Sequence, residues 1–214
     1  MSDEKAPVLV DGEPGSGPTL VLAHGAGGPM DSPFMEQLAA SLAARGLQVV
    51  RFEFPYMRRA RLTGRRGRPD STEELCRAWV DVIGQLGGGA SLFIGGKSMG
   101  GRIASMVADG AGVQGLVCLG YPFHPVGQPE RLRTAHLREL RTPCLIVQGS
   151  RDSFGSRQEI EGFALSRSIE VLFLEDGDHS FNPRKSSGFT PEGHFQHAVE
   201  AVVAFCLRLA GKPA

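Results

Sequence analysis

Residues 91–108 read SLFIGGKSMGGRIASMVA and contain the motif that decides the fold. Ser91–Ile94 is a short apolar run that predicts a strand, and Ile103–Ala108 continues beyond the motif as the apolar face of a helix. Ser98 lies between them in the pattern G-x-S-x-G, in which a sharp turn from strand to helix exposes a serine hydroxyl. The N–H groups of a helix that begins after Ser98 favour a developing negative charge beside it. The segment therefore predicts an activated serine at the edge of an α/β sheet.

Strand and helix signals alternate along the rest of the chain. The other strand candidates are short and almost continuously apolar, which suits a parallel sheet covered on both faces. Helix starts are predicted at Ser32-Pro33, at the capping box formed by Ser71 and Glu74, and at Thr190-Pro191. The strand candidates are Thr19–Ala23, Leu47–Phe52, Val113–Leu119, Pro143–Gln148 and Ile169–Leu174, with Pro7–Val10 as an edge strand.

This alternation predicts a single α/β domain over residues 1–214, with a mostly parallel sheet and helices on both faces. Residues 1–18 are expected to form an N-terminal edge segment, residues 53–70 an arginine-rich loop, and residues 121–140 a small flap. A flap of about twenty residues is too short for a lid domain, so we expect no large cap and an open cleft.

The composition excludes several classes of protein. Hydrophobic residues make up 41% and charged residues 21% of the chain, as in ordinary globular proteins and unlike disordered ones. Lys plus Arg and Asp plus Glu each number 23, and this zero net charge argues against nucleic-acid binding through bulk electrostatics. No apolar run approaches the roughly 18 residues of a membrane span. The start, MSDEK, lacks a leader pattern, so we expect a cytoplasmic protein without nucleic-acid or membrane partners.

The four cysteines lie far apart in the sequence, and no CxxC motif or Cys/His cluster occurs. This spacing favours buried free thiols over disulfides or a zinc site. We therefore expect neither a metal nor a cofactor.

A serine nucleophile requires a base and a group that orients the base, in the chain order Ser, Asp or Glu, His. Asp152 lies in GSRD directly after one strand candidate, and His179 lies in GDHSF directly after another. Open α/β sheets place their sites at such carboxyl strand ends. We therefore predict Ser98 as nucleophile, His179 as base and Asp152 as its orienting partner. The alternative is that a turn serine, a turn aspartate and a surface histidine occupy these three places by coincidence.

A second N–H donor for an oxyanion is expected from the loop after an early strand. The run HGAGG, residues 24–28, follows Thr19–Ala23, and we assign the donors to the backbone N–H groups of Ala26 and Met99. The alternative is a glycine turn that only connects strand to helix. His24 itself is expected to support the loop rather than to act in catalysis.

The motifs HGAGG, GGKSMGGR, GSRD and GDHSF resemble those of α/β-hydrolases over residues 19–209. Within that superfamily the chain is similar to the small hydrolase-like family of the testis-expressed protein and the third subunit of the nonspecific-lethal chromatin complex. The resemblance implies the α/β-hydrolase fold, a catalytic triad of Ser98, Asp152 and His179, and an oxyanion hole shaped by the loop from His24. Dienelactone hydrolases are more distantly similar and use a cysteine where this chain has Ser98.

Two segments are expected to select the substrate. The arginine-rich loop creates a local positive field that would attract an anionic substrate or acidic partner, with Arg58 and Arg59 as binding residues. The alternative is a solvated loop offset by nearby acidic residues. Phe123 in the flap, together with Phe154 and Phe181, is a candidate for the wall of an acyl pocket, or for simple packing. The arginines of the loop are Arg58, Arg59, Arg61, Arg65, Arg66 and Arg68.

The expected activity is hydrolysis of small carboxylic esters or thioesters through an acyl-enzyme on Ser98. One alternative is a non-catalytic binding module of the same fold that uses the basic segment 58–68. Another keeps the serine and changes the reaction to perhydrolysis or acyl transfer, since one fold supports several chemistries.

Overall fold

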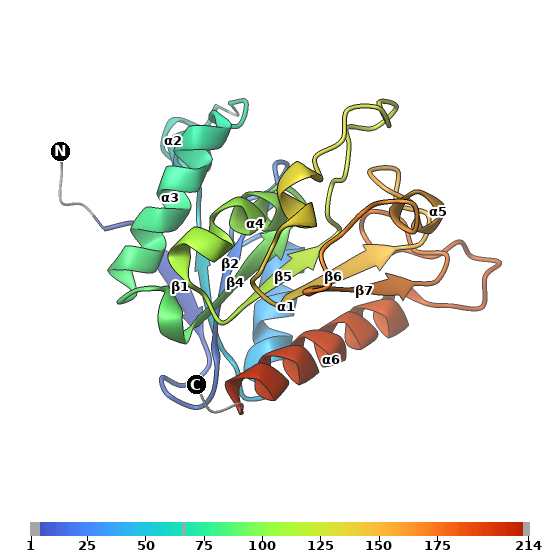
Figure 1. Cartoon of the computed structure of the whole chain (residues 1–214). Helices are drawn as coiled ribbons and strands as arrows, with labels where there is room; N and C mark the ends of the chain where they lie inside the picture. Colours follow the sequence, from blue (N-terminus) through green and yellow to red (C-terminus); the bar gives the residue numbers. More distant parts are fainter. Residues whose placement is uncertain (1–4, 66, 212–214) are drawn as a thin grey trace.

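The computed structural model describes residues 5–65 and 67–211. Its centre is a seven-stranded sheet in the order β1-β3-β2-β4-β5-β6-β7 (Figure 1). β1 runs antiparallel to β3 at one edge, and all the other neighbours pair in parallel. The predicted mostly parallel sheet is thereby confirmed. The strands are β1 (Val8–Asp11), β2 (Thr19–Ala23), β3 (Gln48–Phe52), β4 (Leu92–Lys97), β5 (Gly115–Leu119), β6 (Cys144–Gly149) and β7 (Ile169–Leu174).

β4 is the strand whose predicted end differs most from the structure. The apolar run ends at Ile94, but the strand continues to Lys97. Gly95 and Gly96 pair with β2 on one side and β5 on the other. In the middle of a sheet these glycines let neighbouring backbones approach rather than ending the strand. β4 therefore ends directly before Ser98.

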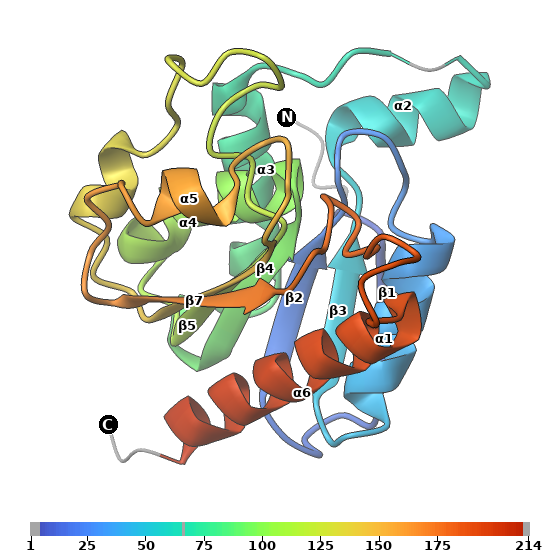
Figure 2. The ribbon, with the colours of Figure 1, turned by 90° about the vertical axis from the view of Figure 1, so that its right-hand side faces the viewer.

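Helices cover both faces of the sheet, as predicted (Figures 1 and 2). One face carries α3 (Thr72–Gln85) and α4 (Met99–Ala111), and the other carries α1 (Pro33–Ala43) and α6 (Pro191–Ala210). Two hydrophobic layers result, which explains why the central strands read as unbroken apolar runs.

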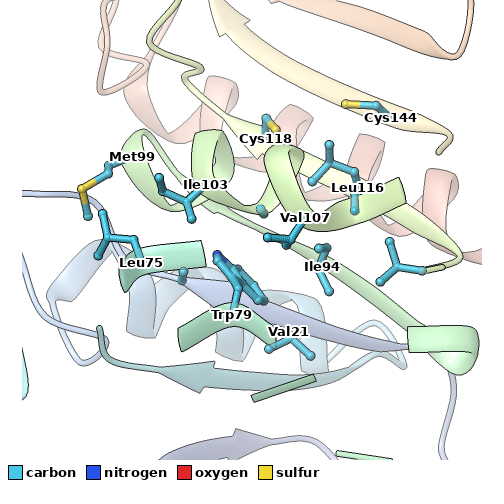
Figure 3. Close-up of a cluster of buried hydrophobic side chains, with 14 of the residues drawn as sticks. Val21, Leu75, Trp79, Ile94, Met99, Ile103, Val107, Leu116, Cys118 and Cys144 are labelled. Atoms are coloured by element: carbon cyan, nitrogen blue, oxygen red, sulfur yellow. The ribbon is translucent and has the colours of Figure 1, made fainter. Parts of the chain in front are cut away.

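Trp79 lies at the centre of the first layer. Figure 3 shows its side chain beside Leu75 of α3, with Ile103 and Val107 of α4 facing it across the layer. The indole is fully buried and packs edge-on against Phe52, with ring centroids 4.7 Å apart. This packing anchors α3 and α4 to the sheet and so holds the start of α4 in place.

The predicted helix starts are confirmed. Ser71 and Glu74 form the reciprocal capping box of α3. Thr190 caps α6 by accepting a hydrogen bond from the Gly193 N–H at 3.0 Å. α1 begins with Pro33 after Ser32, whose side chain makes no capping hydrogen bond.

The arginine-rich segment is not a loop throughout: residues Pro55–Thr63 form helix α2. Pro55 is preorganised for the first turn of a helix, and Gly64 ends the helix with a left-handed φ of 67°. The sequence has no apolar stripe that would predict this helix, because Tyr56 is its one buried residue. Arg61 secures it to the core through ion pairs with Glu53 and Asp31.

The segment 121–140, predicted as a small flap, is irregular apart from a 3₁₀ turn at Ala135–Arg138. It is fastened to the body by the fully buried Tyr121, Phe123 and Leu137. Residues 1–4 of the expected edge segment, Arg66 and residues 212–214 lie outside the described part of the chain.

Each of the four cysteines is a free thiol, as expected; three are buried and Cys76 is half-buried. Within residues 5–65 and 67–211, no helix has the length and apolar character needed to cross a bilayer. The same residues contain no cluster of three His, Cys, Asp or Glu side chains suited to a metal ion.

Candidate active site

Ser98 occupies the sharp turn between β4 and α4. Its φ of 51° and ψ of −115° lie in a region that non-glycine residues rarely adopt. The Ser98 N–H donates to the Leu119 carbonyl at 2.9 Å, and the Ser98 carbonyl accepts from the Arg102 N–H at 3.0 Å. These bonds, with strands on both sides of β4, hold the strained turn in place. The strain exposes the hydroxyl above the carboxyl end of the sheet.

The glycines that flank Ser98 allow this turn to pack against β2. A Cβ atom on Gly96 would overlap the carbonyl oxygen of Ala23. A Cβ atom on Gly100 would meet the same oxygen and would lie 2.7 Å from the carbonyl oxygen of His24. Backbone cannot yield cheaply at such distances, so both positions require glycine.

The structure brings Ser98, His179 and Asp152 together. The Ser98 hydroxyl lies 2.9 Å from His179 Nε2, and His179 Nδ1 lies 2.7 Å from Asp152 Oδ2. A carboxylate only accepts, so Nδ1 carries the proton and Nε2 accepts from the serine hydroxyl. Three residues from the ends of three different strands thus form one continuous hydrogen-bonded chain.

Asp152 is 1% exposed and has three hydrogen-bond donors. Besides His179, the Phe154 N–H donates to Oδ1 at 2.8 Å and Gln148 Nε2 donates to Oδ2 at 2.9 Å. Donors on both oxygens of a buried carboxylate fix its direction. The carboxylate therefore faces His179 in a single orientation.

Gln148 is a component of the site that the sequence analysis did not identify. Its fully buried side chain accepts from the Tyr121 N–H at 2.8 Å and donates to Asp152 and to the carbonyls of Tyr121 and Gly155. It lies at the end of a strand in the sequence and carries no motif, so no local pattern marks it.

Lys97 supports the histidine from the side opposite Asp152. Its Nζ donates to the His179 carbonyl at 2.7 Å and lies 5.5 Å from the centre of the Phe181 ring. Burial lowers the pKa of the Lys97 ammonium to about 8. The residue next to Ser98 in the sequence thereby fixes the backbone of His179.

The loop after β2 is braced by His24, in agreement with its expected structural role. Its Nε2 accepts from the Phe54 N–H at 3.2 Å, so Nδ1 carries the proton and donates to the Gly25 carbonyl at 2.7 Å. Burial lowers the pKa of His24, which favours this neutral form. The Tyr56 hydroxyl of α2 donates to the Ala26 carbonyl at 3.2 Å and fixes the next part of the loop.

The N–H groups of Ala26 and Met99 are the two donors predicted for an oxyanion. Ala26 borders the cavity at Ser98, and Met99 is the first residue of α4. In the part of the chain that the structure describes, neither N–H donates to a protein acceptor. Both N–H groups are therefore without a protein acceptor there, and that of Met99 lies at the positive end of the α4 dipole.

A cavity of about 430 Å³ opens over Ser98. Its wall is mainly apolar and includes Phe34, Met35 and Phe154, whose ring centroid lies 4.4 Å from that of His179. The other lining residues are Gly25, Ala26, Gly27, Gly28, Ser32, Lys97, Ser98, His179 and Ser180.

Of the residues expected to bind substrate, Phe154 lies in this wall and four others lie elsewhere. Phe123 is buried against Tyr121 and Phe163, because its part of the flap folds into the core. Phe181 is 2% exposed and packs on Phe34 from behind. Arg58 and Arg59 project from α2 rather than from a loop over Ser98, and Arg59 is ion-paired with Asp70.

Comparison with known structures shows the same fold in other proteins. An alpha/beta serine hydrolase homologue from Coxiella burnetii superimposes with a TM-score of 0.67 at 21% identity, covering 95% of this chain and 97% of that one. Est1E from Butyrivibrio proteoclasticus, in a structure with bound ferulic acid, gives a TM-score of 0.72 at 15% identity, with 96% of each chain covered. A lidless α/β serine hydrolase from Xanthomonas campestris gives 0.66 at 20% identity, covering 97% of this chain and 90% of that one.

At these identities the structural neighbours establish the fold, and the sequence itself establishes the family. The sequence profile described as "Alpha/beta hydrolase domain" matches residues 16–207, which is most of the chain. With its seven-stranded, mostly parallel sheet and the strained turn at Ser98, the chain belongs to the alpha/beta hydrolase family.

Proposed function

We propose that the chain is a serine hydrolase that cleaves small carboxylic esters or thioesters through an acyl-enzyme on Ser98. The observation that carries this proposal is the unbroken hydrogen-bonded chain from Ser98 through His179 to Asp152, at the floor of an open cavity. Nucleophile, base and orienting carboxylate are already within hydrogen-bonding distance before any substrate binds.

In the first half of the reaction, Ser98 Oγ attacks the ester carbonyl carbon while His179 Nε2 takes the hydroxyl proton. Asp152 stabilises the imidazolium that forms and keeps Nδ1 protonated. The tetrahedral intermediate then collapses: the bond to the leaving oxygen or sulfur breaks, and His179 donates its proton to that atom. The products of this half are the free alcohol or thiol and an acyl group on Ser98.

The negative oxygen of the tetrahedral intermediate is assigned to the N–H groups of Ala26 and Met99. The bracing of the loop by His24 and Tyr56 supports this assignment, because fixed donors need no reorganisation during the reaction. The α4 dipole adds to the same stabilisation.

In the second half, His179 removes a proton from a water molecule that attacks the acyl carbon. The bond to Ser98 Oγ breaks, the serine recovers its proton from His179, and a carboxylic acid leaves. The open cavity admits water, and its largely apolar wall suits an uncharged acyl group.

The relatives favour the same chemistry. Est1E is a neighbour whose structure holds ferulic acid, another neighbour is described as an esterase domain from Rhodothermus marinus, and the Xanthomonas campestris neighbour is described as lacking a lid. By analogy, the substrate here is a small carboxylic ester that reaches Ser98 without passing a lid. We also propose that the chain belongs to the small hydrolase-like family of the testis-expressed protein and the third subunit of the nonspecific-lethal chromatin complex, which its sequence motifs resemble.

A panel of p-nitrophenyl esters and acyl thioesters tests the proposal. The wild type should hydrolyse at least one short-chain member, and Ser98→Ala and His179→Ala should each lower kcat by about 10³-fold or more. Circular dichroism should show both variants folded. If the wild type hydrolyses no member of the panel, or if folded Ser98→Ala retains full activity, the proposed function is wrong.

A further inference from the structure

Two additional cavities lie between the one at Ser98 and α2. A narrow cavity of about 90 Å³ shares Ala26 and Gly27 with it and is bounded on its far side by α2. A wider cavity of about 290 Å³ then shares Pro29, Met57 and Ala60 with the narrow one. Figure 2 shows α2 above the loop between β2 and α1, which contributes the opposite wall. The three cavities therefore adjoin one another in a row from Ser98 to α2, and we call this row the path beneath α2.

The walls of this path are apolar where it leaves the site. Met57 and Ala60 are three residues apart on α2 and share one helical face, with Pro29 opposite. The Tyr56 hydroxyl is engaged by the Ala26 carbonyl, so the ring is the part that lines the path.

Charged groups enter only at the far end. There Arg61 pairs with Glu53 at 2.5 Å and with Asp31 at 2.7 Å. Because Arg61 is already paired with two carboxylates, it is not available to an anionic ligand, and the apolar walls suit an uncharged chain.

The chemistry of the site decides which part of a substrate follows this path. His179 must pass a proton to the leaving group, so the leaving group lies on the side of His179 and Phe154. The narrow and wider cavities are lined by neither residue and depart beside Ala26, on the oxyanion side. The chain that passes Ala26 is therefore attached to the carbonyl carbon.

We propose that the path beneath α2 is continuous with the cavity at Ser98 and binds the acyl chain of the substrate, so that the protein prefers linear, apolar acyl chains of medium length. This inference rests on the proposed hydrolase function, whose substrate class it specifies. Met57, Ala60 and Pro29 determine the chain length, and the flap residues do not.

Blocking the path at Ala60 tests the proposal. Ala60→Trp should lower kcat/KM for p-nitrophenyl decanoate by about tenfold or more and change that for p-nitrophenyl acetate by less than about twofold. Leu62→Trp is the matched control, because Leu62 lies on the same helix, is 85% exposed and borders none of the three cavities. Met57→Ala, which widens the same wall, should shift the preference toward longer chains and serves if Ala60→Trp does not fold.

Equal losses on decanoate and acetate would overturn the proposal, as would no loss on either. If Ala60→Trp lowers kcat/KM for decyl acetate, whose long chain is on the alcohol, and not for p-nitrophenyl decanoate, the assignment of the path to the acyl group is wrong. Binding provides a readout without catalysis: Ser98→Ala should bind p-nitrophenyl decanoate in calorimetry, and adding Ala60→Trp should abolish that binding. If the wild type cleaves no ester, the hydrolase function fails, and this binding measurement still supports or overturns the path.

Discussion

The side chain of Gln148 donates a hydrogen bond to Asp152 at 2.9 Å from a fully buried position beneath the carboxylate. The same amide bonds to the backbone of Tyr121, which follows β5, and of Gly155, which follows Asp152. One side chain thus ties two loops to the strand end that carries the carboxylate. Asp152 orients His179, and Gln148 orients Asp152.

Replacing Gln148 by Leu should therefore lower kcat with little change in KM. The variant removes a donor from Asp152 and leaves the buried backbone groups of Tyr121 without partners, at a cost of about 1–3 kcal/mol each in unfolding free energy. We expect kcat to fall about tenfold or more, because the carboxylate loses its fixed direction. Steady-state kinetics on a short ester and urea unfolding measure the two effects.

Gln85→Leu is the control for Gln148→Leu, because Gln85 donates to the Ala6 carbonyl far from the site. It should alter stability slightly and leave kcat unchanged. Unchanged kcat in folded Gln148→Leu would show that Gln148 has no positioning role.

Lys97 should give the folded protein a distinct pH dependence. Burial lowers the pKa of its ammonium to about 8 from an ordinary value of 10.5, so between these values the unfolded chain binds more protons than the folded one. The contribution of Lys97 to the free energy of unfolding therefore rises with pH in that window, by up to about 1.4 kcal/mol per pH unit. Relative to Lys97→Met, the wild type should gain unfolding free energy from pH 8 to 10.

Urea unfolding of both proteins across this pH range measures the difference. Groups other than Lys97 titrate in both and cancel in the comparison. A difference in unfolding free energy that stays constant from pH 8 to 10 would contradict the lowered pKa.

Gly100→Ala should destabilise the fold by about 1–3 kcal/mol or more, because the new methyl group would overlap backbone carbonyl oxygens of β2 and its following loop. Gly110→Ala is the matched control in the same helix, since a Cβ atom there meets nothing within 4 Å. The control should stabilise by about 0.5–1 kcal/mol through helix propensity. Equal unfolding midpoints in urea for the two variants would refute the close approach of α4 to β2.

Arg58 and Arg59 should act on substrates only through their long-range field, because neither borders the cavity at Ser98. Replacing both by Glu should raise KM for an anionic ester at low ionic strength, and added salt should remove the effect. KM for a neutral ester of the same size should not change. Equal changes for the two esters would mean that the substitutions perturb the fold rather than the field.

Much of the candidate site could be predicted from the sequence, because its main residues each follow an apolar run. Ser98, Asp152 and His179 lie just beyond strand candidates, and parallel strands bring their carboxyl ends to one edge of the sheet. The local sequence pattern was therefore sufficient to identify these three residues, although it could not give the distances between their side chains.

The parts that were missed depend on contacts between distant segments. α2 was taken for a loop because ion pairs of Arg61 with Glu53 and Asp31 stabilise it, in place of an apolar stripe. Gln148 meets Tyr121 only through the register of β5 against β6. Phe123 was a candidate either for the substrate pocket or for simple packing, and the structure shows packing, because its segment folds inward onto Phe163. No periodicity encodes such pairings.

The most direct test of the central claim is covalent labelling of Ser98. Incubation with an alkyl fluorophosphonate, followed by intact-mass and peptide mass spectrometry, should show one phosphonyl adduct on Ser98 in the wild type. Ser98→Ala should remain unlabelled. The labelling rate of His179→Ala should be lower by about 10²-fold or more, because the hydroxyl loses its base. A folded wild type that stays unlabelled, or that carries the adduct on another serine, would contradict the account.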